Sequence, residues 1–195
     1  MTLSLSANDL ACRRGDRVLF RGLSLALGPG DVCHVTGANG IGKTSLLRIL
    51  GGLLAPFAGT VSVEGSMALL DERLALDPDM PLGKALGFWA RIDGVEPATL
   101  ESSCGRLSLG DLLEVPVRYL STGQRKRAAL ARLLGQQTPI WLLDEPLSGL
   151  DQPSQALVAQ LVAEHSAAGG ISVVASHQEL AVEGRIYFAL AEFVA

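Results

Sequence analysis

A glycine-rich stretch of the chain has the residue types needed to hold a phosphate group. It reads G-A-N-G-I-G-K-T and fits the phosphate-binding pattern G-x-x-x-x-G-K-[ST] at every defined position. Glycines let backbone N–H groups approach phosphate oxygens where a Cβ would clash. Lys43 can reach the β- and γ-phosphates, and the Thr44 hydroxyl can hold Mg²⁺. With the serine that follows, the candidate nucleotide-binding residues are Gly37, Ala38, Asn39, Gly40, Ile41, Gly42, Lys43, Thr44 and Ser45.

Two carboxylates follow the apolar run at 140–143 and suit the same chemistry. An apolar strand that ends in acidic residues would deliver them to the carboxyl edge of an open α/β sheet, where ligands bind. Asp144 suits Mg²⁺, directly or through water, and Glu145 can orient and polarise an attacking water. Any strand can end in Asp-Glu at a surface, so the pair gains its meaning from the phosphate loop that precedes it.

A third candidate group precedes a predicted helix after Leu120. A serine hydroxyl and a glycine amide at a helix N-terminus form an anion site, although a simple N-cap is the default interpretation of such residues. The candidates are Ser121, Thr122, Gly123 and Gln124. His177 follows another apolar run, where a lone histidine is usually structural.

The elements around the loop match what a phosphate site requires. A β-branched run at 31–36 predicts a strand before the loop, and 45–50 predicts a helix after it. Alternating apolar residues at 3–7 and 23–27 predict antiparallel strands, joined by a turn near 13–16.

The second half of the chain predicts a parallel sheet. Helices are expected at 123–134 and 155–168, and they alternate with short apolar strands at 140–143 and 171–175. The stretch 186–194 is expected to form one or two closing strands.

A helical insertion is predicted between the two sheet-forming parts, at about 71–135. Helices are expected at 82–92, from Pro97, and at 107–113. We interpret residues 1–195 as one domain that contains this insertion.

Composition limits the possible partners. The net charge of −4 argues against a nucleic-acid partner, which usually leaves a basic footprint. No uninterrupted apolar run reaches the roughly 18 residues needed to cross a bilayer, and residues 1–14 have no signal-peptide features, so we expect a cytoplasmic protein. Cys12, Cys33 and Cys104 form no C-x-x-C pair and predict reduced thiols near the core.

In their order along the chain these motifs resemble those of the ATP-binding cassette (ABC) ATPases. The family signature L-S-G-G-Q corresponds to residues 120–124, with Thr122 as a departure. Residues 148–151 are similar to the family's D-loop, with Asp151, and His177 is similar to its switch histidine.

The resemblance implies an α/β fold of the P-loop NTPase class, ABC type. This fold has a mainly parallel core sheet with helices on both faces, an N-terminal antiparallel β-subdomain and a short helical insertion. It also implies ATP and Mg²⁺ as ligands, catalytic roles for Glu145 and His177, and Mg²⁺ contacts from Thr44 and Asp144. The signature would act in trans on ATP held by a second subunit, which implies a homodimer.

Two positions depart from the family pattern. Arg14 occupies the place of an aromatic residue that stacks on adenine, although a guanidinium can also stack on a ring. Asp71 and Glu72 stand where a magnesium-sensing glutamine is expected.

Several stretches look like the ATP-binding subunit of the haem exporter in cytochrome c maturation (the Ccm system), namely 17–24, 43–54, 86–94 and 120–134. This implies a peripheral protein on the cytoplasmic side of the inner membrane, paired with integral membrane subunits, whose ATP hydrolysis powers release of a haem-loaded chaperone. The chain has no C-x-x-C-H motif, so no direct haem binding is expected.

Other functions remain open from the residues. The chain could serve another ABC exporter of lipid, lipoprotein or drug, or act as a nucleotide-gated interaction module with little hydrolysis. The phosphate loop alone would also fit a small-molecule kinase.

Overall fold

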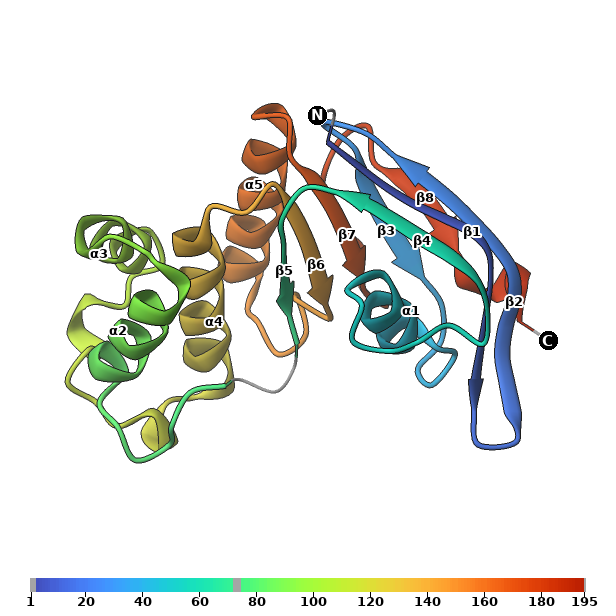
Figure 1. Cartoon of the computed structure of the whole chain (residues 1–195). Coiled ribbons are helices and arrows are strands. Elements are labelled where there is room, and N and C mark those ends of the chain that lie inside the picture. Colours follow the sequence, from blue (N-terminus) through green and yellow to red (C-terminus); the bar gives the residue numbers. More distant parts are fainter. Residues whose placement is uncertain (1–2, 72–74, 195) are drawn as a thin grey trace.

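The computed structural model describes residues 3–71 and 75–194, arranged around two sheets (Figure 1). One sheet is antiparallel with strand order β2-β1-β4, and the other is parallel with order β5-β6-β7-β3-β8. The strands are β1 (Ser4–Arg14), β2 (Arg17–Leu27), β3 (Val32–Thr36), β4 (Ala58–Glu64), β5 (Met67–Leu70), β6 (Ile140–Asp144), β7 (Ile171–Ala175) and β8 (Ile186–Ala189). The helices are α1 (Lys43–Leu50), α2 (Leu82–Asp93), α3 (Pro97–Arg106), α4 (Thr122–Gln136) and α5 (Gln152–Ala167).

The antiparallel sheet forms because its strands alternate apolar and polar residues. Leu5 lies opposite Leu27 and Ala7 opposite Leu25, and all four side chains are buried. Such alternation puts one face of each strand on the core. The predicted antiparallel strands are confirmed, with the turn at Gly15 and Asp16.

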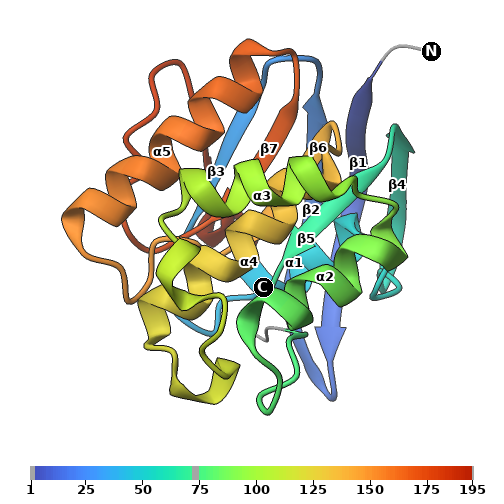
Figure 2. The same cartoon turned by 90° about the vertical axis from the view of Figure 1, so that its left-hand side faces the viewer.

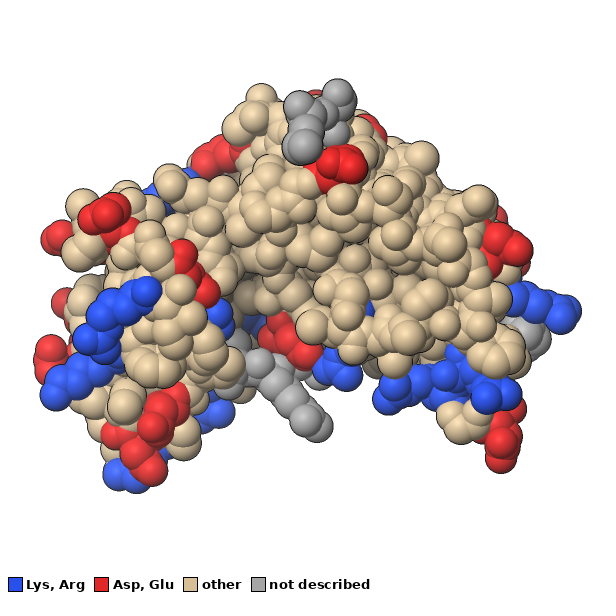
Figure 3. All heavy atoms as spheres, viewed as in Figure 1, with Lys and Arg blue, Asp and Glu red and all other residues tan. Residues whose placement is uncertain are grey.

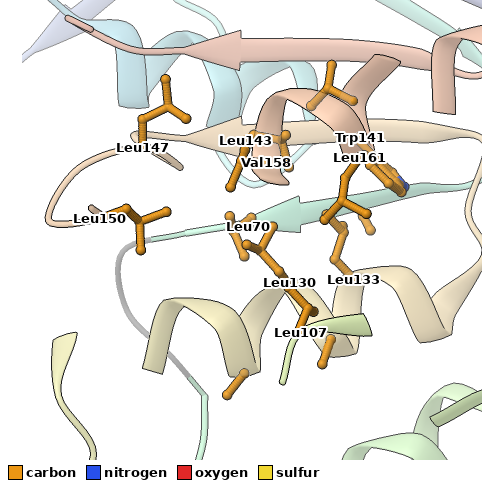
Figure 4. Packing of buried hydrophobic residues seen from close by; sticks show 14 of the residues in the cluster. Leu70, Leu107, Leu130, Leu133, Trp141, Leu143, Leu147, Leu150, Val158 and Leu161 are labelled. Carbon is orange, nitrogen blue, oxygen red and sulfur yellow. The ribbon is translucent and has the colours of Figure 1, made fainter. Parts of the chain in front are cut away.

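The parallel sheet is covered on both faces, because its strands are apolar at nearly every position. Trp141 and Leu143 of β6 face a cluster that includes residues of α4 and α5, as Figure 4 shows, whereas Ile140 and Leu142 face a cluster that includes residues of α1 and the antiparallel sheet. This confirms the predicted α/β class, with a mainly parallel core sheet, helices on both faces and an antiparallel part at the N-terminal end.

Three helices gather at one side of the sheet. Figures 1 and 2 show α2, α3 and α4 together there, and Arg132 of α4 pairs with Asp93 of α2 (Nε–Oδ2 3.0 Å). The predicted helices at 82–92 and from Pro97 are confirmed as α2 and α3.

One predicted helix was wrong. The stretch 107–113 forms only a 3₁₀ turn at Gly110–Leu112, because Ser108 has a positive φ of 50° that no right-handed helix allows. The predicted closing strand within 186–194 is confirmed as β8, which covers the first part of that stretch, and a 3₁₀ turn at Leu190–Phe193 follows it. That turn buries Leu190 completely and stacks Phe193 on Phe188.

The surface matches the modest charged fraction of the chain. On the face shown in Figure 3, uncharged side chains form most of the broad middle, and Lys and Arg side chains gather toward the two lower ends. Among the described residues, no helix has both the length and the apolar character required for a membrane span.

Candidate active site

The phosphate loop joins the end of β3 to the start of α1. Gly37, Gly40 and Gly42 have φ values of 149°, 78° and 122°, which side chains rarely tolerate. A Cβ at Gly42 would also lie 3.3 Å from the Phe20 ring. The loop can therefore take this shape only with glycine at these positions.

Lys43 is the first residue of α1, and its ammonium lies inside the loop. The side chain is only 6% exposed, and Nζ donates hydrogen bonds to the carbonyl oxygens of Gly37 (2.8 Å) and Ala38 (3.4 Å). It also pairs with Glu145 Oε1 at 3.3 Å. A buried cation thus lies where the sequence predicts a phosphate.

Glu145 connects this lysine to the predicted histidine. Its Oε2 lies 2.9 Å from His177 Nδ1, and the carboxylate is 12% exposed. The backbone of Glu145 has a positive φ of 45° and its N–H donates to the Ala175 carbonyl at 2.8 Å. This conformation turns the chain as it leaves β6, so Glu145 meets both Lys43 and His177.

A hollow of about 340 Å³ opens beside these three side chains. It is lined by loop residues 39, 40 and 42–45, by Leu19, and by Glu145, Ser148 and His177. The structure thus brings together predicted residues from three separate parts of the chain.

Thr44 provides an oxygen atom at this hollow, whereas Asp144 is not among the described residues that line it and lines a second hollow of about 360 Å³. Asp144 ends β6 with 4% exposure, directly before Glu145. A hydroxyl and a carboxylate are hard oxygen ligands, and Mg²⁺ often takes only one or two protein ligands and keeps several waters. The donor set therefore fits a magnesium ion held together with phosphate oxygens.

The segment 121–124 lies elsewhere and begins α4. Ser121 Oγ accepts from the Gln124 N–H (3.2 Å), and Gln124 Oε1 accepts from the Ser121 N–H (2.8 Å), which forms a capping box. Thr122 Cγ2 lies near Gly149, since a Cβ added there would be 3.3 Å away. None of these four residues is among the described residues that line the hollow.

Three other predicted positions are not among the described residues that line the hollow. Asp151 caps α5 by accepting from the Ser154 N–H at 3.0 Å, and hydrogen bonds from Ser154 lower the pKa of its carboxyl. Arg14 is exposed at the end of β1, and Asp71 pairs with Arg48 at 2.7 Å. Glu72 lies outside the described residues.

Lys126 is a residue that the sequence analysis missed. Its Nζ donates to the carbonyl oxygens of Glu145 (2.6 Å) and Ser148 (2.8 Å), so it links α4 to the turn after β6. Two arginines, Arg125 and Arg127, flank it in the sequence, and no local pattern distinguishes it from them.

The comparison with protein families identifies this arrangement. Residues 20–148 match the family model described as ABC transporter. The chain belongs to the ABC transporter family. As a member of this family, the chain hydrolyses ATP in connection with transport.

Curated relatives match nearly the whole chain. A protein of Novosphingobium aromaticivorans named cytochrome c biogenesis ATP-binding export protein CcmA is 58% identical, over 92% of this chain and 91% of its own length. A protein with the same name from Sphingopyxis alaskensis is 48% identical, over 93% of this chain and 94% of its own length. Another, from Zymomonas mobilis, is also 48% identical, over 98% of this chain and 86% of its own length.

Solved structures agree on the fold. A subunit of an ABC transporter complex from Clostridium perfringens superposes with a TM-score of 0.72 at 23% identity, over 91% of this chain and 80% of that chain. A Pyrococcus furiosus protein that carries the name of an ABC transporter ATP-binding protein gives a TM-score of 0.86 at 24% identity, over 98% of this chain and 100% of that chain. At these identities the likeness concerns the fold alone.

Proposed function

We propose that this chain is the ATP-binding and ATP-hydrolysing subunit of an ABC transporter complex that energises c-type cytochrome biogenesis. The work would be haem export or release of a haem-loaded chaperone, performed from the cytoplasmic side of the inner membrane. The observation that carries this assignment is the 58% identity, over nearly the full length of both chains, to a protein named for that process. We further propose that residues 1–195 act as one ATPase unit with the helical insertion at about 71–135.

The residues of the hollow would divide the work of phosphate cleavage. The loop amides and Lys43 would bind the phosphates, with Lys43 exchanging its loop carbonyls and Glu145 for phosphate oxygens. Thr44 and Asp144 would hold Mg²⁺, which supplies charge neutralisation when bound. Glu145, once released by Lys43, would orient the attacking water, and His177 would contact the γ-phosphate.

Two copies of the chain would complete each site. Exposed Ser121 and half-buried Gly123 lie at the start of a 15-residue helix. The capping box uses the Gln124 N–H, so an anion there would be held by the positive end of the helix and by other N–H groups of its first turn. Ser121 and Gly123 are not among the described residues that line the hollow of their own chain. A homodimer that sandwiches ATP between the hollow of one copy and the segment 121–124 of the other accounts for both facts.

Substitutions at the hollow test these roles. Glu145→Gln should lower ATP turnover by about two to four orders of magnitude, as for loss of a positioned base, and should trap an ATP-bound dimer. Lys43→Ala should abolish nucleotide binding. Glu114→Gln, at an exposed glutamate that is not among the residues lining the hollow, is the matched control. Unchanged ATP hydrolysis in both site variants would exclude this mechanism. So would a Glu145→Gln variant that remains monomeric when ATP is bound.

Membrane subunits are proposed to dock on the helical side. A shallow hollow of about 570 Å³ on α2 and α3 is lined by Met80, Lys84 and Phe88 among others, and Phe88 is 44% exposed. Trp89 is used differently, since its indole donates to the Ala75 carbonyl and Arg132 stacks on its ring at 3.9 Å.

Co-expression tests both the docking surface and the pathway. Complex formation with a cytochrome c maturation membrane subunit, with stimulated ATPase activity, is the expected result, and Phe88→Ser should weaken it. Preference for the membrane subunits of a lipid, lipoprotein or drug exporter would redirect the assignment to that transporter.

We propose that the subunit supplies energy without touching haem. His34 is 1% exposed, His177 lies against Glu145, and the ring of His165 stacks on Trp141 with centroids 3.8 Å apart. Each histidine ring is therefore already in contact with other parts of the protein. Haem titration of the purified chain should give no stoichiometric Soret shift. A shift that a histidine substitution removes would refute this proposal.

A further inference from the structure

An exposed tyrosine stands directly before the segment 121–124. Tyr119 is 68% exposed, whereas Val117 and Leu120 on either side of it are 4% and 2% exposed. The two buried neighbours anchor this short stretch to the core. The chain therefore holds most of an aromatic side chain in solvent beside the start of α4.

The turn that carries Tyr119 is tied to its surroundings. The Tyr119 N–H donates to the Pro116 carbonyl at 2.9 Å, and Arg125 Nη2, near the start of α4, donates to the Arg118 carbonyl at 3.1 Å. The Arg118 guanidinium lies over the Tyr119 ring, 4.9 Å from its centroid, and pairs with Asp79 at 2.5 Å. With a cation over one face and most of the ring exposed, the opposite face is open to a planar ligand.

The hollow beside Lys43 has little apolar surface for a nucleotide base. The described residues that line it include no Phe, Tyr or Trp, and Leu19 is the one aliphatic side chain among them. Leu19 is itself only 9% exposed. Bases bind proteins chiefly by stacking on flat side chains. A base beside Leu19 would therefore have one face in water unless a further surface covers it.

The hollow and Tyr119 belong to the same side of the molecule. Figure 1 shows β3, β6 and β7 ending toward the lower edge of the view, where the phosphate loop follows β3, and α4 begins at that lower edge too. A second copy related by a twofold axis can thus place the start of its α4 over this hollow. Tyr119 is two residues from Ser121, so their Cα atoms are at most about 7.6 Å apart.

We propose that Tyr119 is a nucleotide-binding residue that acts in trans, stacking its ring on the base of the ATP held by the second copy. The inference rests on the nucleotide site and the homodimer proposed above. Tyr119 is not among the described residues that line the hollow of its own chain. It would therefore contribute nothing to ATP binding by a separate chain, and would favour the dimer closed over ATP.

The test uses the full chain with Glu145→Gln, in which ATP is expected to trap the dimer. Analytical ultracentrifugation measures the MgATP concentration that gives half-maximal dimer. Tyr119→Ala should raise this concentration about five- to fiftyfold, as for loss of one base–aromatic stack. Tyr119→Phe keeps the ring and should stay within about twofold of the parent.

The chain offers a matched control in Tyr187. This tyrosine is 58% exposed, and the Arg185 guanidinium lies over its ring, 5.0 Å from the centroid. It is not among the described residues that line the hollow. Tyr187→Ala should therefore leave ATP-driven dimer formation unchanged.

Two further measurements separate stacking in trans from other roles. A ribose-labelled fluorescent ATP analogue should bind dilute, monomeric Tyr119→Ala as tightly as its parent, whereas a contact within one chain would weaken this binding. With UTP in place of ATP, the loss of dimer caused by Tyr119→Ala should be about two- to fivefold smaller, because a pyrimidine stacks over less area. A tyrosine that touches only the protein surface of the partner would weaken both nucleotides equally.

Three results would overturn the inference. These are an unchanged ATP requirement for dimer formation in Tyr119→Ala, equal losses with ATP and UTP, and weaker binding of the analogue to the monomer. Failure of the Glu145→Gln chain itself to form a dimer with ATP would instead refute the proposed homodimer, and the inference with it.

Discussion

Replacing Lys126 by methionine removes a cation that links two parts of the site. Its ammonium donates to the carbonyl oxygens of Glu145 and Ser148, at 2.6 and 2.8 Å. Methionine keeps the length of the apolar stem but donates nothing. The variant should therefore loosen the turn after β6, which carries Glu145, and separate it from α4.

The size of the effect follows from these two bonds. Hydrogen bonds to a charged donor contribute about 1.5–3 kcal/mol each, and half-burial of Lys126 puts both at the lower end, so we expect a loss of about 3 kcal/mol in the free energy of unfolding. Glu145 would lose a contact that holds its backbone at a φ of 45°. A shift of its carboxylate by about 1 Å would lower ATP turnover by about 10²-fold.

Urea unfolding followed by circular dichroism measures the first quantity, and phosphate release under saturating MgATP measures the second. Lys84→Met, at an exposed lysine of α2, is the control for loss of charge. A loss below about 0.5 kcal/mol relative to this control, the usual range for surface changes, would refute the energetic reasoning. Reduced stability with unchanged turnover would refute the positioning of Glu145.

Three further predictions concern stability and reactivity. Burial lowers the pKa of His34 below its ordinary value of 6.5, so the unfolded chain binds a proton that the folded chain does not. The free energy of unfolding should fall as the pH drops below about 6.5, by at most about 1.4 kcal/mol per pH unit for this group, and His34→Asn should flatten that slope in urea titrations at pH 5–8. Burial raises the pKa of Cys33 to about 12, and Cys12 and Cys104 are also buried. Ellman's reagent at pH 8 should therefore react only after urea is added, and rapid reaction of the folded chain would contradict this burial. Ser121→Ala removes the acceptor for the Gln124 N–H and should cost about 1 kcal/mol of stability, with Ser121→Thr as the control that keeps a hydroxyl.

Features that depend on neighbouring residues could be predicted from the sequence. The phosphate loop is a continuous stretch whose positive φ angles require glycine, so the positions of its glycines already predict its backbone conformation. Asp144 and Glu145 were predicted at a sheet edge because the apolar run before them could only be a buried strand. The alternation in β1 and β2 and the proline that opens α3 are equally local signals.

Contacts between residues far apart in the sequence could not be predicted from local patterns, or were suggested only by the family resemblance. Lys126 contacts Glu145 across 19 positions, and Arg48 contacts Asp71 across 23. His177 meets Glu145 across 32 positions, and only its order among the motifs suggested a role. The 3₁₀ turn near Leu109 replaced a predicted helix because that side chain is completely buried and Ser108 adopts a positive φ.

The amino-acid sequence by itself thus determined the phosphate loop, the acidic strand end and the layered α/β class, since backbone preference and apolar periodicity act over a few residues. Only the tertiary structure decided which cation lies against which carboxylate. Charged side chains carry no local signal of their partner, and parallel pairing of β5 with β6, together with packing of α1 and α4 on the sheet, is what brings them within reach.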